Sequence, residues 1–286
     1  MAKVGANGIQ IEYETTGDPG NSPLLLIIGL ADQLIHWDDG LCADLAARGH
    51  YVIRFDNRDS GLSTKCDRQA SVSVGGHKTP PSYSLDDMAD DAMGLLDALG
   101  ITRAHLCGAS MGGMIAQCAA IRHPSRVLSL TSIYSTTGNK SLPPPDPEVM
   151  DLLRTPAPRD REGYVEYMVL FIRMTTGKSF IFDEAYVRQI SQRAYDRSFC
   201  PEGTARQFRA IATQTDRRQA LASLTAPTLV VQGTDDPLVS VEAGRDMVDA
   251  IPGARLLLIE GMGHDLARGG AWPVIVEALA THTCKS

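Results

Sequence analysis

"AHLCGASMGGMIAQCAA", residues 104–120, places Ser110 between a short apolar run and a longer apolar stretch with helical character. Residues 108–112 read Gly-Ala-Ser-Met-Gly, a G-x-S-x-G pattern. At a sharp turn from a strand into a helix, Cβ atoms beside the serine would collide, whereas glycines let the turn close and lift the hydroxyl above the sheet. The pattern in this context predicts a nucleophilic serine. The alternative is a glycine-rich turn that happens to contain a serine.

Apolar runs alternate with helical patterns along most of the chain, as they do in a parallel sheet covered by helices. Ser84 is a suitable N-cap for a helix that carries Asp86 and Asp87 in its first turn and ends at Gly100. The fold class is therefore predicted as α/β, with a mostly parallel sheet flanked by helices. The expected strands are residues 9–14, 23–29, 51–56, 104–108, 127–134, 227–233 and 255–260.

The alternation breaks after Tyr134. Residues 135–222 contain no clear strand, begin with the proline-rich "SLPPPDP" and continue with several helical stretches. An insertion of this kind between two halves of one sheet is typical of a lid. We therefore expect a core formed by residues 1–134 and 223–286, with residues 135–222 inserted as a helical cap.

A serine nucleophile needs a base and an acid that orients the base. His264 follows a predicted strand and lies between Gly261 and Gly263 in "RLLLIEGMGHDL", so its loop can carry the ring to another strand's end. In G-x-S-x-G hydrolases the acid comes from a strand end between the serine and the histidine. "VVQGTDDP" is such an end, and the pattern leaves Asp235 and Asp236 as candidates. His105 and His123 read as structural, whereas His36 could line a pocket.

Composition argues against several classes of function. The net charge of -7, from 27 basic and 34 acidic residues, disfavours nucleic acid or an anionic membrane as a partner, because both select clustered Lys and Arg. The six cysteines have no metal-ligand spacing, which favours reduced thiols and predicts no metal. The N-terminus lacks a signal-peptide pattern, and the longest apolar run, "LLLIIGLA", is too short to span a bilayer. We expect a cytoplasmic protein, and nothing in the sequence indicates an oligomeric state.

Taken together, the serine motif, the aspartate pair, His264, "IIGL" at residues 27–30 and "RFDNRDSGLSTK" at residues 54–65 resemble the α/β-hydrolase family over nearly the whole chain. The resemblance implies the α/β-hydrolase fold and places the acid on Asp236, three residues after the glycine that ends its strand. Asp235 is then expected to accept hydrogen bonds from nearby amides of the turn. It also implies an oxyanion hole made by the backbone amides of Leu30 and Met111. No metal or organic cofactor is implied.

Two positions depart from the commoner family pattern. Ile28-Gly29 stands where the family usually has a histidine-glycine pair, and Asp59 stands at a usual glycine. The second variant is similar to the branch that contains macrolide esterases and aclacinomycin-type methylesterases. We expect Arg58 and Asp59 to form a buried structural pair that braces the nucleophile turn.

The predicted function is a serine-dependent carboxylic-ester hydrolase whose partner is a small-molecule ester. The substrate is expected to be a bulky apolar ester or a macrolactone, with macrolide ring opening the more specific prediction. Polyketide methyl-ester cleavage is an alternative, as is perhydrolase, C–C hydrolase, thioesterase or acyltransferase chemistry on the same residues. A non-catalytic ligand receptor of this fold is the alternative from another class. The expected substrate-binding residues are His36, Tyr167, Met168 and Phe171.

Overall fold

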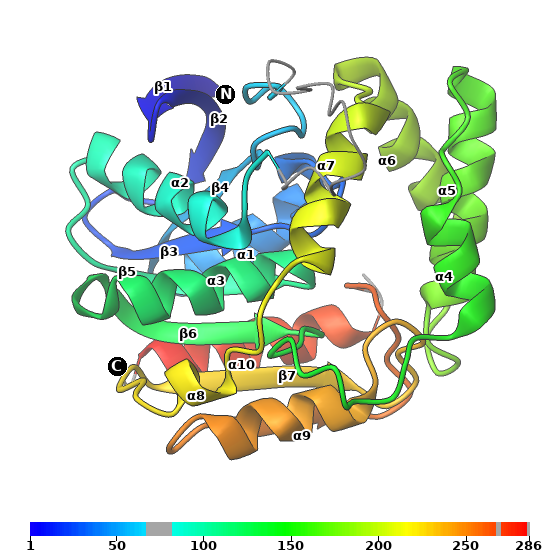
Figure 1. The fold of residues 1–286 in the computed structure, drawn as a ribbon. Helices are drawn as coiled ribbons and strands as arrows, with labels where there is room; N and C mark the ends of the chain where they lie inside the picture. The colour runs from blue at the N-terminus through cyan, green and yellow to red at the C-terminus, as the bar shows by residue number, and fades with distance from the viewer. Residues whose placement is uncertain (67–81, 267–269, 285–286) are drawn as a thin grey trace, which may run out of the picture.

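An eight-stranded sheet runs through the centre of the computed structural model, which describes residues 1–66, 82–266 and 270–284 (Figure 1). The strand order is β1-β2-β4-β3-β5-β6-β7-β8. β1 and β2 pair antiparallel, β2 pairs antiparallel with β4, and all other pairs are parallel. The strands are β1 (Ala2–Ala6), β2 (Ile9–Thr16), β3 (Ser22–Ile27), β4 (His50–Phe55), β5 (Ala104–Ala109), β6 (Val127–Ile133), β7 (Thr228–Gly233) and β8 (Arg255–Ile259).

All seven predicted strands are present, each with bounds close to those expected from the sequence. β1 was not predicted. Its sequence, Ala-Lys-Val-Gly-Ala, has little apolar patterning, and at the edge of the sheet most of its residues are exposed. Five residue pairs join this strand to β2, and Val4 and Ala6 pack against the hydrophobic core.

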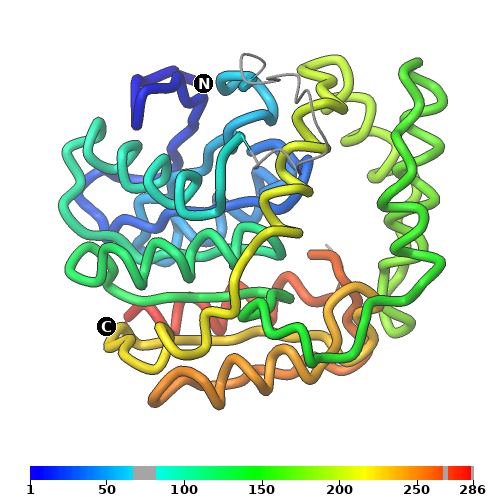
Figure 2. The backbone as a smooth tube through the Cα atoms, in the orientation of Figure 1, coloured from blue at the N-terminus to red at the C-terminus, as the bar shows by residue number. Residues whose placement is uncertain are grey.

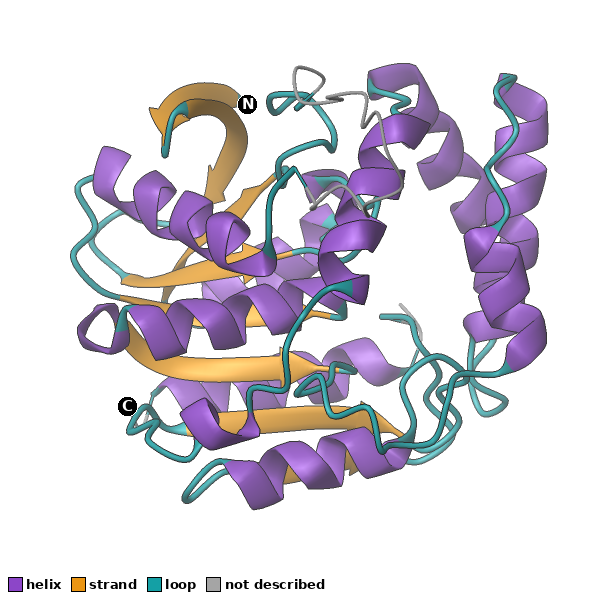
Figure 3. Ribbon diagram, in the orientation of Figure 1, coloured by secondary structure: helices purple, strands orange, loops and turns teal. Residues whose placement is uncertain are grey.

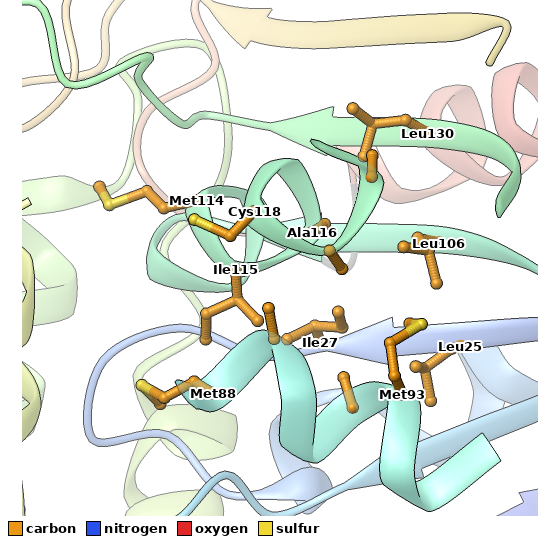
Figure 4. Close-up of a cluster of buried hydrophobic side chains, with 14 of the residues drawn as sticks. Leu25, Ile27, Met88, Met93, Leu106, Met114, Ile115, Ala116, Cys118 and Leu130 are labelled. Atoms are coloured by element: carbon orange, nitrogen blue, oxygen red, sulfur yellow. The ribbon is translucent and has the colours of Figure 1, made fainter. Parts of the chain in front are cut away.

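Helices cover both faces of the sheet (Figure 3). One face packs against α2 (Leu85–Ala98), α3 (Met111–Arg122) and α9 (Val241–Ala250), and the other against α1 (Asp39–Ala47) and α10 (Ala271–Thr283). Side chains of β3 alternate between the two faces of the sheet. Leu25 and Ile27 join the hydrophobic cluster under α2, α3 and α9, and Leu24 and Leu26 join the cluster under α1 and α10. Because both faces are buried, the strand reads as a continuous apolar run. Figure 4 shows part of the hydrophobic cluster that lies between the sheet and the helices α2 and α3.

Residues 135–222, between β6 and β7, contain helices and no strand. We call them the inserted segment. The helices of the inserted segment are α4 (Pro147–Arg154), α5 (Arg161–Thr175), α6 (Glu184–Arg197), α7 (Pro201–Ala212) and α8 (Arg218–Leu221). Two 3-10 turns, η1 (Leu34–His36) and η3 (Pro124–Arg126), lie before this segment in the chain. In Figure 1 and Figure 2 the helices α4, α5 and α6, at the right, lie beyond the carboxyl ends of the parallel strands, whereas α8 lies nearer the C-terminus. Loops that follow parallel strands meet at that edge, where ligands bind in open α/β sheets.

Candidate active site

Ser110 occupies a strained turn between β5 and α3. Its backbone angles, φ 54° and ψ -120°, are rare for a residue with a side chain. A Cβ on Gly108 would lie 2.1 Å from the Gly112 carbonyl oxygen, and one on Gly112 would lie 2.0 Å from the Ile27 carbonyl oxygen. The turn therefore closes only with glycine at both positions, for the steric reason expected from the sequence. This conformation places the hydroxyl at the carboxyl edge of the sheet.

The structure brings Ser110, His264 and Asp236 into one hydrogen-bonded line. His264 Nε2 is 2.9 Å from Ser110 Oγ, and His264 Nδ1 is 2.8 Å from Asp236 Oδ2. An ionised carboxylate can only accept a hydrogen bond, so the ring proton belongs on Nδ1 and Nε2 can accept from the serine hydroxyl. The His264 amide also donates to the Thr175 carbonyl at the end of α5 (2.8 Å). The inserted segment thus helps to position the histidine loop.

Asp235 and Asp236 have different surroundings. Asp236 is buried, and its Oδ1 accepts from the amides of Leu238 and Val239, both at 2.8 Å. The Asp235 side chain contacts only the Thr234 hydroxyl, at 3.4 Å, among the described residues. We had expected Asp235 to accept the amides of the turn. That expectation is wrong, because Asp236 binds those amides with one oxygen and His264 with the other.

The predicted oxyanion donors lie on either side of Ser110. Met111 is the first residue of α3, whose N-terminal amides favour negative charge nearby. Leu30 follows Gly29 after β3, and the Cβ of Ser110 lies 3.4 Å from where a Gly29 Cβ would stand. Within the described chain, the amides of Leu30 and Met111 donate no hydrogen bond, whereas the amide of Ala31 donates to Gln207 (2.8 Å). Both amides therefore remain available to a ligand.

A cavity of about 370 Å³ opens onto Ser110 and His264. Three of the predicted substrate-binding residues, Tyr167, Met168 and Phe171, line it from α5. A wider hollow of about 640 Å³ lies between β8 and α10, but it contains none of the predicted site residues. The cavity at Ser110 is therefore the candidate substrate site. Its aromatic lining consists of Tyr134, Tyr164, Tyr167, Phe171, Phe199 and Phe208.

His36 does not line the cavity, contrary to the prediction. It ends η1, where its Nδ1 accepts the Gln33 amide at 2.9 Å in a reciprocal capping arrangement. The same nitrogen lies 3.6 Å from Asp32 Oδ1. The side chain is held by its own turn, and a sequence pattern does not reveal on which side of a short turn a ring will lie.

Arg58 and Asp59 are both buried, but they are not paired with each other as expected. Arg58 binds Asp91 of α2 through two hydrogen bonds of 2.6 and 2.7 Å. Asp59 accepts two from Arg206 of α7 (2.7 and 2.8 Å) and one from the Tyr83 hydroxyl (2.7 Å). Burial acts to raise the pKa of Asp59, but the Arg206 guanidinium and the other donors hold it below its usual value. The aspartate at the usual glycine position therefore joins the core to the inserted segment.

Tyr134 and Asp32 are among the cavity residues that were missed in the sequence, and both lie close to His264 or Ser110. The Tyr134 ring lies 4.5 Å from the His264 ring, measured between centroids. Asp32 lies two residues beyond Leu30 on the loop after β3 and lines the cavity. Burial raises the pKa of Asp32, while His36 and His264 act to lower it. Each residue lies at or just after the carboxyl end of a predicted parallel strand, and that position was the available signal.

No group of side chains suited to a metal ion occurs in residues 1–66, 82–266 and 270–284. Over the same ranges, no helix is both long and apolar enough to cross a membrane.

Comparison with known proteins identifies similar sequences and folds. The model of the alpha/beta hydrolase fold family matches residues 22–267. Rhodomycin D methylesterase from Streptomyces sp. (strain C5) is 31% identical over 290 residues, covering 94% of this chain and 93% of that protein. The rhodomycin D methylesterase of Streptomyces peucetius is 30% identical with the same coverage. The enol-lactonase of Burkholderia xenovorans LB400 superposes with a TM-score of 0.78 at 21% identity over the full length of both chains, a likeness of fold.

Proposed function

The chain belongs to the α/β-hydrolase family and is a carboxylic-ester hydrolase, and from this premise we propose that Ser110 is its nucleophile, His264 its general base and Asp236 the acid that orients the histidine. The observation that supports these roles best is the hydrogen-bonded line of the three side chains beside a cavity. We propose further that the inserted segment acts as a cap over that cavity, since α5 supplies part of its wall.

The proposed reaction has two stages. Ser110 Oγ attacks the ester carbonyl carbon while its proton passes to His264 Nε2, and the imidazolium is stabilised by Asp236. The amides of Leu30 and Met111 hold the negative oxygen of the tetrahedral intermediate. His264 then protonates the departing alcohol. A water molecule, deprotonated by His264, cleaves the acyl-enzyme and releases the carboxylic acid with Ser110 restored.

The cavity favours an apolar substrate that carries rings. Six aromatic side chains line it, and its volume lies near the lower end of the usual range for ligand pockets. Met168 can adapt to an irregular surface. Since the two relatives named above are methylesterases, we propose methyl-ester cleavage of a bulky, ring-containing carboxylic ester as the activity. Macrolide ring opening remains a prediction, and no feature of the cavity favours it over the methyl ester.

Mass balance separates these reactions. A methyl ester yields methanol and an acid, whereas a macrolactone gains one water, about 18 mass units, without losing a fragment. We expect polycyclic methyl esters to be converted by the wild-type protein, without added thiol or peroxide, and not by Ser110→Ala. Turnover only of small acetates would exclude the bulky substrate. Ring opening of a macrolide would favour macrolide esterase activity over methyl-ester cleavage. Binding of esters without turnover of any of them would favour a non-catalytic ligand receptor.

We also propose a reducing compartment such as the cytoplasm, because the six cysteines are free thiols.

A further inference from the structure

Asp32 presents to the catalytic cavity a carboxylate that accepts no hydrogen bond from the described residues. Its side chain is 36% exposed, and the residue lines the cavity beside Ser110. A Cβ on Gly29 would lie 3.4 Å from the Ser110 Cβ and 3.5 Å from Asp32 Oδ2. The carboxylate and the nucleophile therefore flank the same point. Among the described residues no group donates a hydrogen bond to either carboxylate oxygen.

The neighbouring basic groups make no hydrogen bond to this carboxylate among the described residues. His36 Nδ1 is 3.6 Å from Asp32 Oδ1, beyond hydrogen-bond distance. That nitrogen lies 2.9 Å from the Gln33 amide nitrogen and 3.1 Å from the Gln33 carbonyl oxygen, so its hydrogen bonds in either tautomer are made within its own turn. Arg154 also lines the cavity, from the end of α4, but it forms no ion pair with Asp32 in the described chain. The acceptor capacity of Asp32 is thus directed at a ligand.

Aromatic rings surround the same space. Tyr164 and Phe199 pack edge to face with 5.4 Å between ring centroids, and both line the cavity with Tyr134. The pKa values of Tyr134 and Tyr164 are raised first by burial and then by the charge of Asp32, so both hydroxyls lie within the field of the carboxylate. A negative charge beside aromatic faces is the environment that proteins use to bind ammonium groups.

We propose that Asp32 determines substrate specificity by binding a cationic ammonium group of the ester, placed within reach of the carbonyl that Ser110 attacks. A cation in the cavity would offset the desolvation that raises the pKa of Asp32 and would so stabilise the charged carboxylate. An ammonium group can pair with the negative carboxylate and also pack on the aromatic faces by cation–π contact. A hydroxyl carries no charge and makes both contacts more weakly. This inference rests on the proposed function, because it names the substrate class of the same site.

Two pairs of esters that differ only in charge provide the test. Methyl 4-(trimethylammonio)butanoate and methyl 5,5-dimethylhexanoate place the cation or its neutral isostere on the acyl side. Butyrylcholine and 3,3-dimethylbutyl butyrate place it on the alcohol side. The ratio of kcat/KM for the charged and neutral members is measured in the wild type and in Asp32→Asn. Comparing ratios between proteins cancels the intrinsic reactivity of each ester.

We expect the charged-to-neutral ratio to fall about tenfold in Asp32→Asn for at least one pair, the size of a desolvated cation–π or charge-assisted contact. Asp44→Asn is the matched control, because it removes the same charge from an exposed position on α1 and should leave the ratio as in the wild type. An unchanged ratio in Asp32→Asn for both pairs would overturn the proposal. An equal fall in the Asp44→Asn control would attribute the preference to net charge, and would overturn it as well.

Binding provides a second readout that does not depend on turnover. Ser110→Ala should bind the charged ester of at least one pair about tenfold more tightly than its neutral isostere, as measured by calorimetry. Equal binding within both pairs contradicts the role of Asp32, even if Asp32→Asn does not fold. If the wild type hydrolyses the esters without charge preference, only this inference fails. If it hydrolyses no ester at all, the proposed function fails, and the binding measurement still decides the role of Asp32.

Discussion

Asp235 and Asp236 are neighbours in sequence, yet only one of them contacts the imidazole. Asp236 combines two amide hydrogen bonds with the contact to His264 Nδ1, so its carboxylate is fixed in position. Asp235 is partly exposed and makes one long contact to a hydroxyl. Geometry alone therefore assigns them different effects on catalysis.

Asp236→Asn should lower kcat by about four orders of magnitude, because an amide can select the wrong ring tautomer and cannot stabilise the imidazolium. Asp235→Asn is the matched control and should change kcat by less than about threefold. Steady-state kinetics on one methyl ester checks both. The opposite ranking would move the acid to Asp235.

Among single residues, the sequence was most informative where backbone geometry demands a residue type. Gly108 and Gly112 are required by steric contact, and that requirement can be recognised in the motif itself. The partners of Arg58 and Asp59, by contrast, are Asp91 and Arg206, which lie far away in the chain. No local pattern encodes such contacts.

At the scale of elements, three histidines lie at the end of the sheet opposite the active site. His105 of β5 bonds to the hydroxyls of Ser129 (2.8 Å) and Ser22 (3.1 Å). Burial, followed by smaller effects of His50, His282 and Arg103, lowers the pKa of His105 to about 4 from its ordinary 6.5. The folded protein therefore keeps this ring neutral at a pH where the unfolded chain binds a proton.

The free energy of unfolding should consequently fall as the pH drops from about 7 to about 5. The unfolded state gains a proton near pH 6.5 and the folded state only near pH 4, so the loss due to His105 is about 2 kcal/mol between about pH 7 and pH 5. Urea denaturation at both pH values measures it, and His105→Gln should remove that part of the loss. An identical pH dependence in wild type and His105→Gln would contradict the assignment.

The strands of the sheet could be predicted because each buried parallel strand is a short apolar run bounded by turn residues. β1 could not, since it lies at the edge and carries only one large apolar side chain, Val4. The helices of the inserted segment could be recognised as helical, but their packing against the core could not. That packing depends on buried polar contacts between sequence positions more than a hundred residues apart.

At the scale of the whole molecule, buried contacts fasten the inserted segment to the core next to the cavity. Arg197 of α6 pairs with Asp56 at 2.7 Å, and the side chains are 8% and 0% exposed. Asp56 also accepts the amides of Leu34 and Leu62, both at 2.7 Å. Gln207 of α7 is fully buried, accepts a hydrogen bond from the Ala31 amide and donates one to the Arg58 carbonyl. These contacts set the position of the helices that complete the cavity wall.

Arg197→Met should destabilise the protein by about 3–5 kcal/mol, because it leaves the Asp56 charge buried without its partner. Arg161→Met breaks an exposed pair with Asp196 and should have little effect. The double variant Asp56→Asn/Arg197→Met should recover part of the loss. Thermal or urea denaturation checks the series, and equal effects of Arg197→Met and Arg161→Met would contradict the structural role of the buried pair.

The nucleophilic role of Ser110 is tested most directly by covalent labelling. A fluorophosphonate loses fluoride to an activated serine and leaves a phosphonyl group on its oxygen, so it reports nucleophile and base together. We predict one adduct per chain, located by peptide mass spectrometry on Ser110, absent from Ser110→Ala and formed far more slowly by His264→Ala. A folded wild-type protein that remains unlabelled, or that carries the adduct on another residue while Ser110→Ala still hydrolyses esters, would contradict the account.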